Sequence, residues 1–208
     1  MILIPLNEID ARLDHGARWI PGWGDWESTE GATCLHGAIR HCQLVPGDAY
    51  LIQQVGSQFG FGIDDNDRSK SWEEVRAQVP PVVTDQMLAE TFGPQWEPIV
   101  ALVRRAAVLT VDELSKLAAT RTAARDAAGA ATWDAAKAST RTAAWDAAWA
   151  AVWGAAMDGA GTAATDAAWG LVVRDLIGQH GLTQAHYDRL TAPWTTVIGP
   201  AHPDDLRR

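Results

Sequence analysis

Two cysteines and two histidines stand close together in the stretch CLHGAIRHC, residues 34–42, and such side chains bind metals or act as nucleophiles. A zinc ion requires ligands that converge on one point. If the stretch is helical, Cys34 and Cys42 share a face but lie about 12 Å apart along the axis, and His36 points elsewhere. We therefore expect buried free thiols here, and we assign no role to His41.

A second candidate is the acidic run around Asp64, Asp65 and Asp67. It lacks the alternating ligands, central glycine and terminal glutamate of a calcium-binding EF-hand loop. The sequence also lacks a P-loop, a dinucleotide-binding fingerprint and a nucleophile elbow. We therefore predict no catalytic residues, no metal and no cofactor, and we interpret the three aspartates as a partner-binding surface.

The third candidate is a twenty-residue repeat of Ala, Trp and Asp that fills residues 120–179. Its alanines favour helix, and its indoles are large enough to fill the space between closely packed helices. We expect Trp145, Trp149 and Trp153 to be buried in the core or across a homodimer. The alternative is a small-ligand platform, because indoles stack on bases and guanidinium groups grip phosphate; its residues are Arg121, Arg125, Trp133, Lys137, Arg141, Trp145 and Trp149.

The elements that position these residues are predicted to be mainly α-helical. We expect a small acidic helical subdomain with a tryptophan-rich loop over residues 1–80, and an Ala-rich helical unit with a C-terminal helix and tail over residues 81–208. Twenty residues make about 5.6 helical turns, so one unbroken rod would rotate equivalent positions away from a common face. We therefore predict an antiparallel helical unit with breaks near Ser139-Thr140 and near Gly159.

Capping residues predict where individual helices begin and end. Two capping boxes, Ser71 with Glu74 and Thr110 with Glu113, each mark a helix start. Single caps are expected at Thr33, Thr84 and Thr183. The last helix should end at Pro193-Trp194, because proline interrupts the helical hydrogen bonds, and residues 195–208 should form an extended, polar tail.

The charge is distributed unevenly. The chain has a net charge of −9, and residues 1–100 carry 15 acidic and 6 basic side chains. The absence of a basic stripe argues against nucleic-acid binding. The sequence has no long apolar span and no secretory signal pattern, and its two cysteines fit a reducing compartment. We expect a cytoplasmic protein that does not bind membranes.

Several short motifs resemble those of known proteins: CLHGAI at 34–39, ND at 66–67 and WEEV at 72–75. On these motifs, residues 13–79 resemble a small domain-of-unknown-function family of actinobacterial and actinophage proteins, although RSKS at 68–71 replaces the usual Arg-Thr. Residues 120–200, with their DAAW units and HYD at 186–188, are similar to Ala/Trp/Asp-repeat actinophage proteins. The resemblance implies an actinobacteriophage accessory protein in the host cytoplasm and implies no reaction.

Two functional hypotheses follow. The first is a non-enzymatic accessory protein that binds and modulates a bacterial host protein, for example one that serves defence. It is supported by the acidic first half of the chain, which would speed association with a basic partner. The second is a binder, or sponge, that sequesters a nucleotide immune signal through the Trp/Arg repeat.

Overall fold

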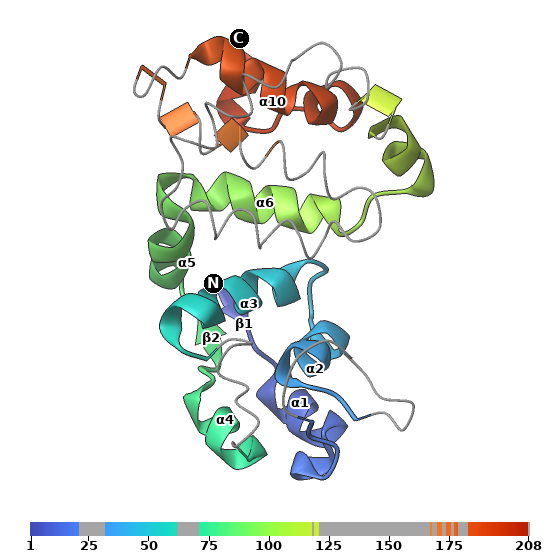
Figure 1. Ribbon diagram of the computed structural model, residues 1–208, viewed down its shortest axis with the longest axis vertical. Coiled ribbons are helices and arrows are strands. Elements are labelled where there is room, and N and C mark those ends of the chain that lie inside the picture. The colour runs from blue at the N-terminus through green and yellow to red at the C-terminus, as the bar shows by residue number, and fades with distance from the viewer. Residues whose placement is uncertain are drawn as a thin grey trace. The chain divides into compact units, whose positions relative to one another are not determined.

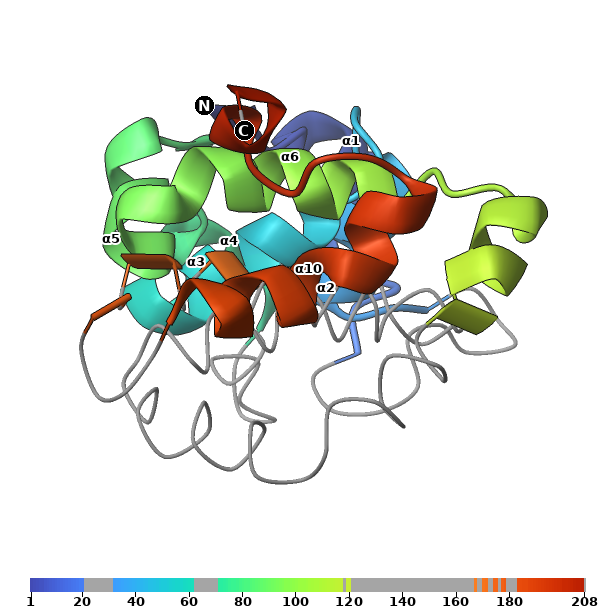
Figure 2. The ribbon, with the colours of Figure 1, turned by 90° about the horizontal axis from the view of Figure 1, so that it is seen from above.

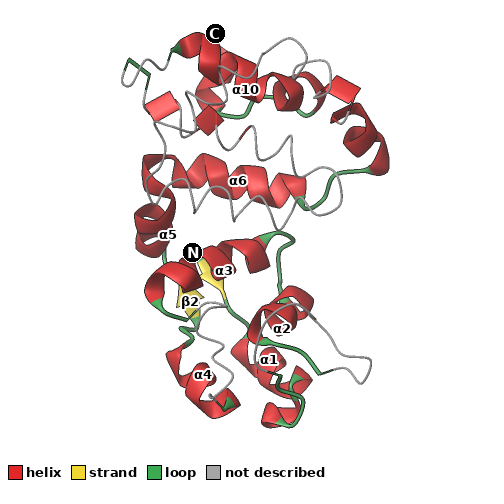
Figure 3. Ribbon diagram, in the orientation of Figure 1, coloured by secondary structure: helices red, strands yellow, loops and turns green. Residues whose placement is uncertain are grey.

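Helices dominate the chain, as predicted. The computed structural model describes residues 1–20, 32–61, 71–117, 119–120, 167, 170–171, 174–175, 177–178 and 183–207. Within these residues the regular structure consists of helices and one two-stranded sheet (Figures 1 and 3). The chain divides into two compact units, Met1–Leu88 and Ala89–Arg208, so this division falls eight residues after the end of the subdomain expected at residue 80.

The first unit combines short helices with the sheet. Strand β1 (Ile2–Leu3) pairs antiparallel with β2 (Val82–Val83), and the Ile4 amide donates to the Pro81 carbonyl at 3.0 Å. The segment that follows Pro80-Pro81 therefore belongs to this unit. Its other described elements are α1 (Leu6–Arg12), the 3₁₀ turn η1 (Asp14–Gly16), α2 (Leu35–Cys42), α3 (Asp48–Phe59), α4 (Trp72–Gln78) and the start of α5 (Asp85–Phe92).

Local capping explains where two of these helices begin. At the start of α4 the Ser71 hydroxyl accepts from the Glu74 amide at 3.4 Å, and the Glu74 carboxylate accepts from the Ser71 amide at 2.7 Å. This arrangement confirms the predicted capping box. The Thr84 hydroxyl likewise accepts from the Met87 amide at 3.2 Å and caps α5. Helix α3 ends at Gly60, whose φ of 81° is a left-handed conformation that glycine adopts without strain.

The predicted cap at Thr33 is wrong. The N-cap of α2 is Cys34, and its side chain makes no capping hydrogen bond. Thr33 is fully buried, and its backbone forms a parallel bridge with Trp19. Because the amide of Thr33 donates to Arg18 and its carbonyl accepts from Ile20, the residue links two distant segments and is not available to start the helix.

A tryptophan ties the helices of the first unit together. Trp72 is 4% exposed, and its ring lies 5.4 Å from that of Trp19, measured between centroids. Its indole N–H donates to the Asp10 carboxylate at 3.0 Å, and Arg76 Nε donates to the same carboxylate at 3.1 Å. The burial of a large aromatic ring whose one polar group is satisfied holds α4 against the first helical segment.

The second unit contains the turn η3 (Gly93–Gln95), α6 (Trp96–Ala106), a helix that begins at residue 111, α10 (Gln184–Val197) and the turn η4 (Pro203–Arg207). The capping box predicted before residue 111 is confirmed, since the Glu113 amide donates to the Thr110 hydroxyl at 3.3 Å and the Thr110 amide to the Glu113 carboxylate at 2.9 Å. Figure 2 shows the stretch after α10 running back beside α6.

The predicted end of the last helix at Pro193 is wrong, as is the extended tail. Helix α10 passes through Pro193 and reaches Val197. Trp194, the residue that follows Pro193, is only 2% exposed. Proline removes one helical hydrogen bond, but burial of an indole can offset that loss. Residues 203–207 then form η4, and Ala201 is buried. The tail is therefore part of the folded unit.

The described core of this unit includes residues of α6 and of α10. Ile99, Leu102 and Val103 are buried on α6, as Tyr187, Leu190 and Trp194 are on α10. Gly170 allows a close approach to α10, because a Cβ at this position would lie 2.4 Å from the Thr191 methyl group. No helix within the described part of the chain has the length and apolar character needed to cross a lipid bilayer.

Candidate functional site

The binding residues predicted from the sequence lie outside the described residues. This applies to the partner-binding Asp64, Asp65 and Asp67. It also applies to the ligand platform of Arg121, Arg125, Trp133, Lys137, Arg141, Trp145 and Trp149. Trp153 and the helix breaks near Ser139-Thr140 and Gly159 lie in the same undescribed part, so all of these remain predictions.

The structure describes the cysteine and histidine cluster, and the pKa shifts of His36 and Cys42 both favour the neutral side chain. His36 is buried against the Tyr50 ring at 5.8 Å between centroids. Burial, followed by the charge of Arg40, lowers its pKa from 6.5 to about 3, so the ring is neutral at pH 7. Burial also raises the pKa of the Cys42 thiol, which is therefore not an activated nucleophile. In the described part of the chain no three His, Cys, Asp or Glu side chains are grouped to hold a metal ion.

A pocket of about 730 Å³ in the second unit is the strongest candidate site. One wall comes from η3 and α6, and the other comes from the end of α10 and the stretch that leads into η4. The apolar lining includes Leu102 and Trp194, together with Pro94, Pro98, Ala101, Ile198, Pro200, Ala201, Pro203 and Leu206. This size and this apolar lining are typical of sites that bind small molecules or the side chains of a partner.

Among the described residues, four polar side chains also line the pocket, and two of them are already paired. Arg105 forms an ion pair with Glu113, and the Gln95 amide donates to Asp175 at 2.6 Å. The carboxylate of Glu97 is exposed, and no hydrogen bond or ion pair joins it to another described residue. The fourth polar residue is His202, in the stretch before η4.

The hydrogen bonding of His202 defines its role in the pocket wall. Its Nδ1 accepts from the Asp204 amide at 3.1 Å. Burial, followed by the charge of Arg174, lowers the pKa of His202 despite the neighbouring carboxylates. The ring is therefore neutral at pH 7, and because Nδ1 is the acceptor, Nε2 carries the proton and acts as a donor.

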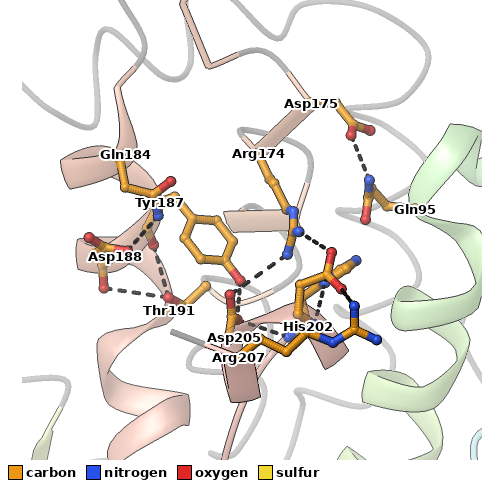
Figure 4. A network of polar contacts seen from close by, with 11 residues as sticks. Gln95, Arg174, Asp175, Gln184, Tyr187, Asp188, Thr191, His202, Asp205 and Arg207 are labelled. Carbon is orange, nitrogen blue, oxygen red and sulfur yellow. Dashed lines mark hydrogen bonds and ion pairs between the residues drawn. The ribbon is translucent and has the colours of Figure 1, made fainter.

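A polar network holds residues 198–202, which we call the His202 stretch, in place (Figure 4). Arg174 pairs with Asp204 at 2.6 Å and approaches Asp205 at 3.7 Å, and its guanidinium carbon lies 6.0 Å from the centre of the Tyr187 ring. The Tyr187 hydroxyl donates to Asp205, whose carboxylate also accepts from the His202 amide at 3.1 Å. Burial, followed by the hydrogen bond and charge of Asp205, raises the pKa of Tyr187, so it remains a neutral donor.

Comparisons of the chain with protein-family models, with curated proteins and with solved structures found no match. The candidate site is therefore defined by its own geometry. Sequence reasoning missed it because Arg174, Tyr187 and Asp205 are far apart in the chain and share no common motif. One local signal was available, since Pro203-Asp204-Asp205 is a typical start of a helical turn.

Proposed function

We propose that this chain is a non-enzymatic accessory protein of the actinobacteriophage type, which binds a bacterial host protein and modulates it. A host protein that serves defence is the first partner to test. The pocket between α6 and the His202 stretch is the proposed contact site. The observation that supports this role is a pocket of about 730 Å³ with mostly apolar walls, large enough to receive side chains of a partner.

The polar groups around the pocket support binding over catalysis. Arg105 is paired with Glu113, and Arg174 is paired with Asp204. His202 and Tyr187 have pKa values shifted in the direction that keeps each of them neutral at pH 7. A general acid or base instead works best with a pKa near the operating pH. These groups thus have the properties of a rigid wall that presents an apolar surface.

Affinity capture from an actinobacterial lysate, read by mass spectrometry, tests the proposal. The bait is the full chain, and two substitutions of exposed alanines are compared with it. Ala101→Trp places an indole in the pocket, whereas Ala185→Trp makes the same change on α10 away from the pocket lining. We expect a host protein to be retained by the full chain and by Ala185→Trp, and to be lost with Ala101→Trp.

Two outcomes would overturn this proposal. One is a captured set of proteins that is identical for all three baits, which would show that the pocket makes no contact with a partner. The other is turnover of a small molecule by the purified chain. The bait variants should be compared by circular dichroism, so that a loss of capture is not confused with a loss of fold.

A small-ligand binder is the second candidate. The volume of the pocket favours it, because small-molecule sites commonly occupy about 300–1,000 Å³. The Trp/Arg platform of the repeat is the other place where such a ligand could bind. Titration calorimetry with cyclic and ADP-ribose-type nucleotides tests this version, and substitution of Arg121, Arg125 or Arg141 should weaken binding if the platform is used.

A further inference from the structure

We infer that the pocket between α6 and the His202 stretch binds an extended segment of the partner protein in which a basic side chain neighbours an apolar one. This inference rests on the proposed function and specifies the chemistry of the partner. It is carried by three features of the pocket lining: an apolar floor, a hydrogen-bond donor and one carboxylate that pairs with no other described residue.

The apolar floor, formed by residues such as Leu102, Trp194 and Leu206, favours the apolar side chain of the partner segment. Leu102 and Trp194 line the pocket and are 4% and 2% exposed, so each adds only a small apolar surface to the lining. Leu206, at 76% exposure, leaves most of its side chain uncovered on the same lining. An apolar side chain inserted here would remove both its own surface and that of Leu206 from water, which is the basis of an anchor residue.

The donor is Nε2 of His202. Its Nδ1 already accepts from the Asp204 amide, and the network around Arg174 and Asp205 fixes the backbone on which the ring is carried. A neutral imidazole held in this way offers one N–H at a defined position. The group that matches a single neutral donor is a carbonyl oxygen, and an extended peptide presents one at each residue.

The preference for a basic side chain in the partner segment comes from the carboxylate of Glu97. Among the described residues of the lining, Arg105 is compensated by Glu113, His202 is neutral and Gln95 carries no charge. The Glu97 carboxylate therefore gives this described lining an excess negative charge. This charge attracts a lysine or arginine and repels phosphate or carboxylate groups. The pocket therefore discriminates against nucleotides and acidic peptides and favours a basic segment.

A peptide library tests the inference. Random seven-residue peptides displayed on yeast are selected against the full chain, against Glu97→Gln and Glu97→Lys, and against Ala101→Trp with Ala185→Trp as its matched control. We expect the full chain and Ala185→Trp to enrich peptides that place Lys or Arg beside an apolar residue. Glu97→Gln should lose the charge preference, Glu97→Lys should select acidic residues in its place, and Ala101→Trp should reduce enrichment at least tenfold.

Folding has to be separated from recognition, because Glu97 lies in the first turn of α6, where a carboxylate stabilises the helix N-terminus. Circular dichroism and thermal melting of each variant provide that control. A peptide that still binds Glu97→Lys with the same sequence preference would overturn the inference. Peptides that bind Ala101→Trp as well as they bind the full chain, or the absence of any enrichment, would also overturn it.

The two proposals can fail independently. A host protein that is captured by the full chain and lost with Ala101→Trp, but retained equally by Glu97→Lys, would overturn the basic-segment inference and leave the proposed function in place. A chain that captures no host protein in a pocket-dependent way would overturn the proposed function itself. If the library nevertheless enriched peptides with a basic residue beside an apolar one, that result would show what the pocket binds but would not support a host-protein partner.

Discussion

The hydroxyl of Tyr187 donates a hydrogen bond to the carboxylate of Asp205, eighteen residues later in the chain. The same Asp205 oxygen accepts from the His202 amide at 3.1 Å. One carboxylate thus joins the first turn of α10 to the stretch that forms a wall of the pocket. Because Tyr187 is 2% exposed, water cannot readily replace the lost partner when this bond is broken.

Removal of the Tyr187 hydroxyl should loosen the pocket wall. We expect Tyr187→Phe to lower the free energy of unfolding by about 1–3 kcal/mol, since the bond joins a buried donor to a charged acceptor. Hydrogen exchange of residues 198–207 should accelerate at the same time. Thr196→Val is the matched control, because it removes an exposed hydroxyl of α10 that donates only to the Ala192 carbonyl, at 2.7 Å. Equal effects of the two substitutions would contradict the prediction.

Alkaline pH should weaken the same contact. The pKa of Tyr187 is raised above its usual value of 10 by burial and by Asp205, so the unfolded chain loses the phenolic proton at a lower pH than the folded chain does. The contribution of Tyr187 is therefore complete below about pH 10 and decreases as the pH rises further. We expect the stability difference between the wild-type chain and Tyr187→Phe to shrink between pH 9 and pH 11 in denaturant titrations. A stability difference that stays constant over this pH range would argue against the raised pKa of Tyr187.

Acid should destabilise the first unit through His36. Its pKa is lowered from 6.5 to about 3, so the unfolded chain takes up a proton below pH 6.5 while the folded chain does not. Stability should then fall by up to about 1.4 kcal/mol per pH unit below this value. His36→Gln lacks the titrating ring, so we expect its unfolding free energy to change less between pH 7 and pH 5. Parallel curves for the two proteins would show that His36 is not the cause.

The close contact between Gly170 and Thr191 predicts that a substitution of Thr191 restores the stability lost when Gly170 is replaced by alanine. A Cβ at residue 170 would lie 2.4 Å from the Thr191 Cγ2 atom, so Gly170→Ala should lower the free energy of unfolding by about 1–3 kcal/mol through overpacking. Alanine would otherwise favour a helix over glycine. Thr191→Ser removes the methyl group and keeps the hydroxyl that donates to the Tyr187 carbonyl at 3.0 Å. The double variant should recover most of the loss; a double-mutant cycle with no coupling would contradict this.

Sequence and structure agree where the interactions are local. The capping boxes at Ser71 and Thr110 use only residues three positions apart, and both were predicted correctly. Thr33 satisfied the same local rule, but its backbone is engaged by Trp19 and its neighbours, fourteen positions earlier. The capping rule therefore identified these helix starts but failed at Thr33, whose backbone is hydrogen-bonded to a distant segment.

The pocket could not have been predicted in this way. Its second wall depends on a helix that continues through Pro193 and on Arg174, Tyr187 and Asp205, whose contacts span 18 to 31 positions. The local tendency of proline to end a helix was outweighed by the burial of Trp194. The sequence could indicate that charged residues were present near the C-terminal end, but not that they would pair with one another.

The pairing of Ile2 with Val83 has a consequence for the order in which the first unit folds. During synthesis β1 is made early, but it has no strand to pair with until the segment near residue 83 has also been made. Closing so long a loop is entropically costly, and folds that depend on such distant contacts form slowly. We therefore expect the helices between the strands to collapse first, and the sheet then to pair the two ends of the unit. A unit closed in this way could be inserted into a surface loop of another protein with little strain at either junction.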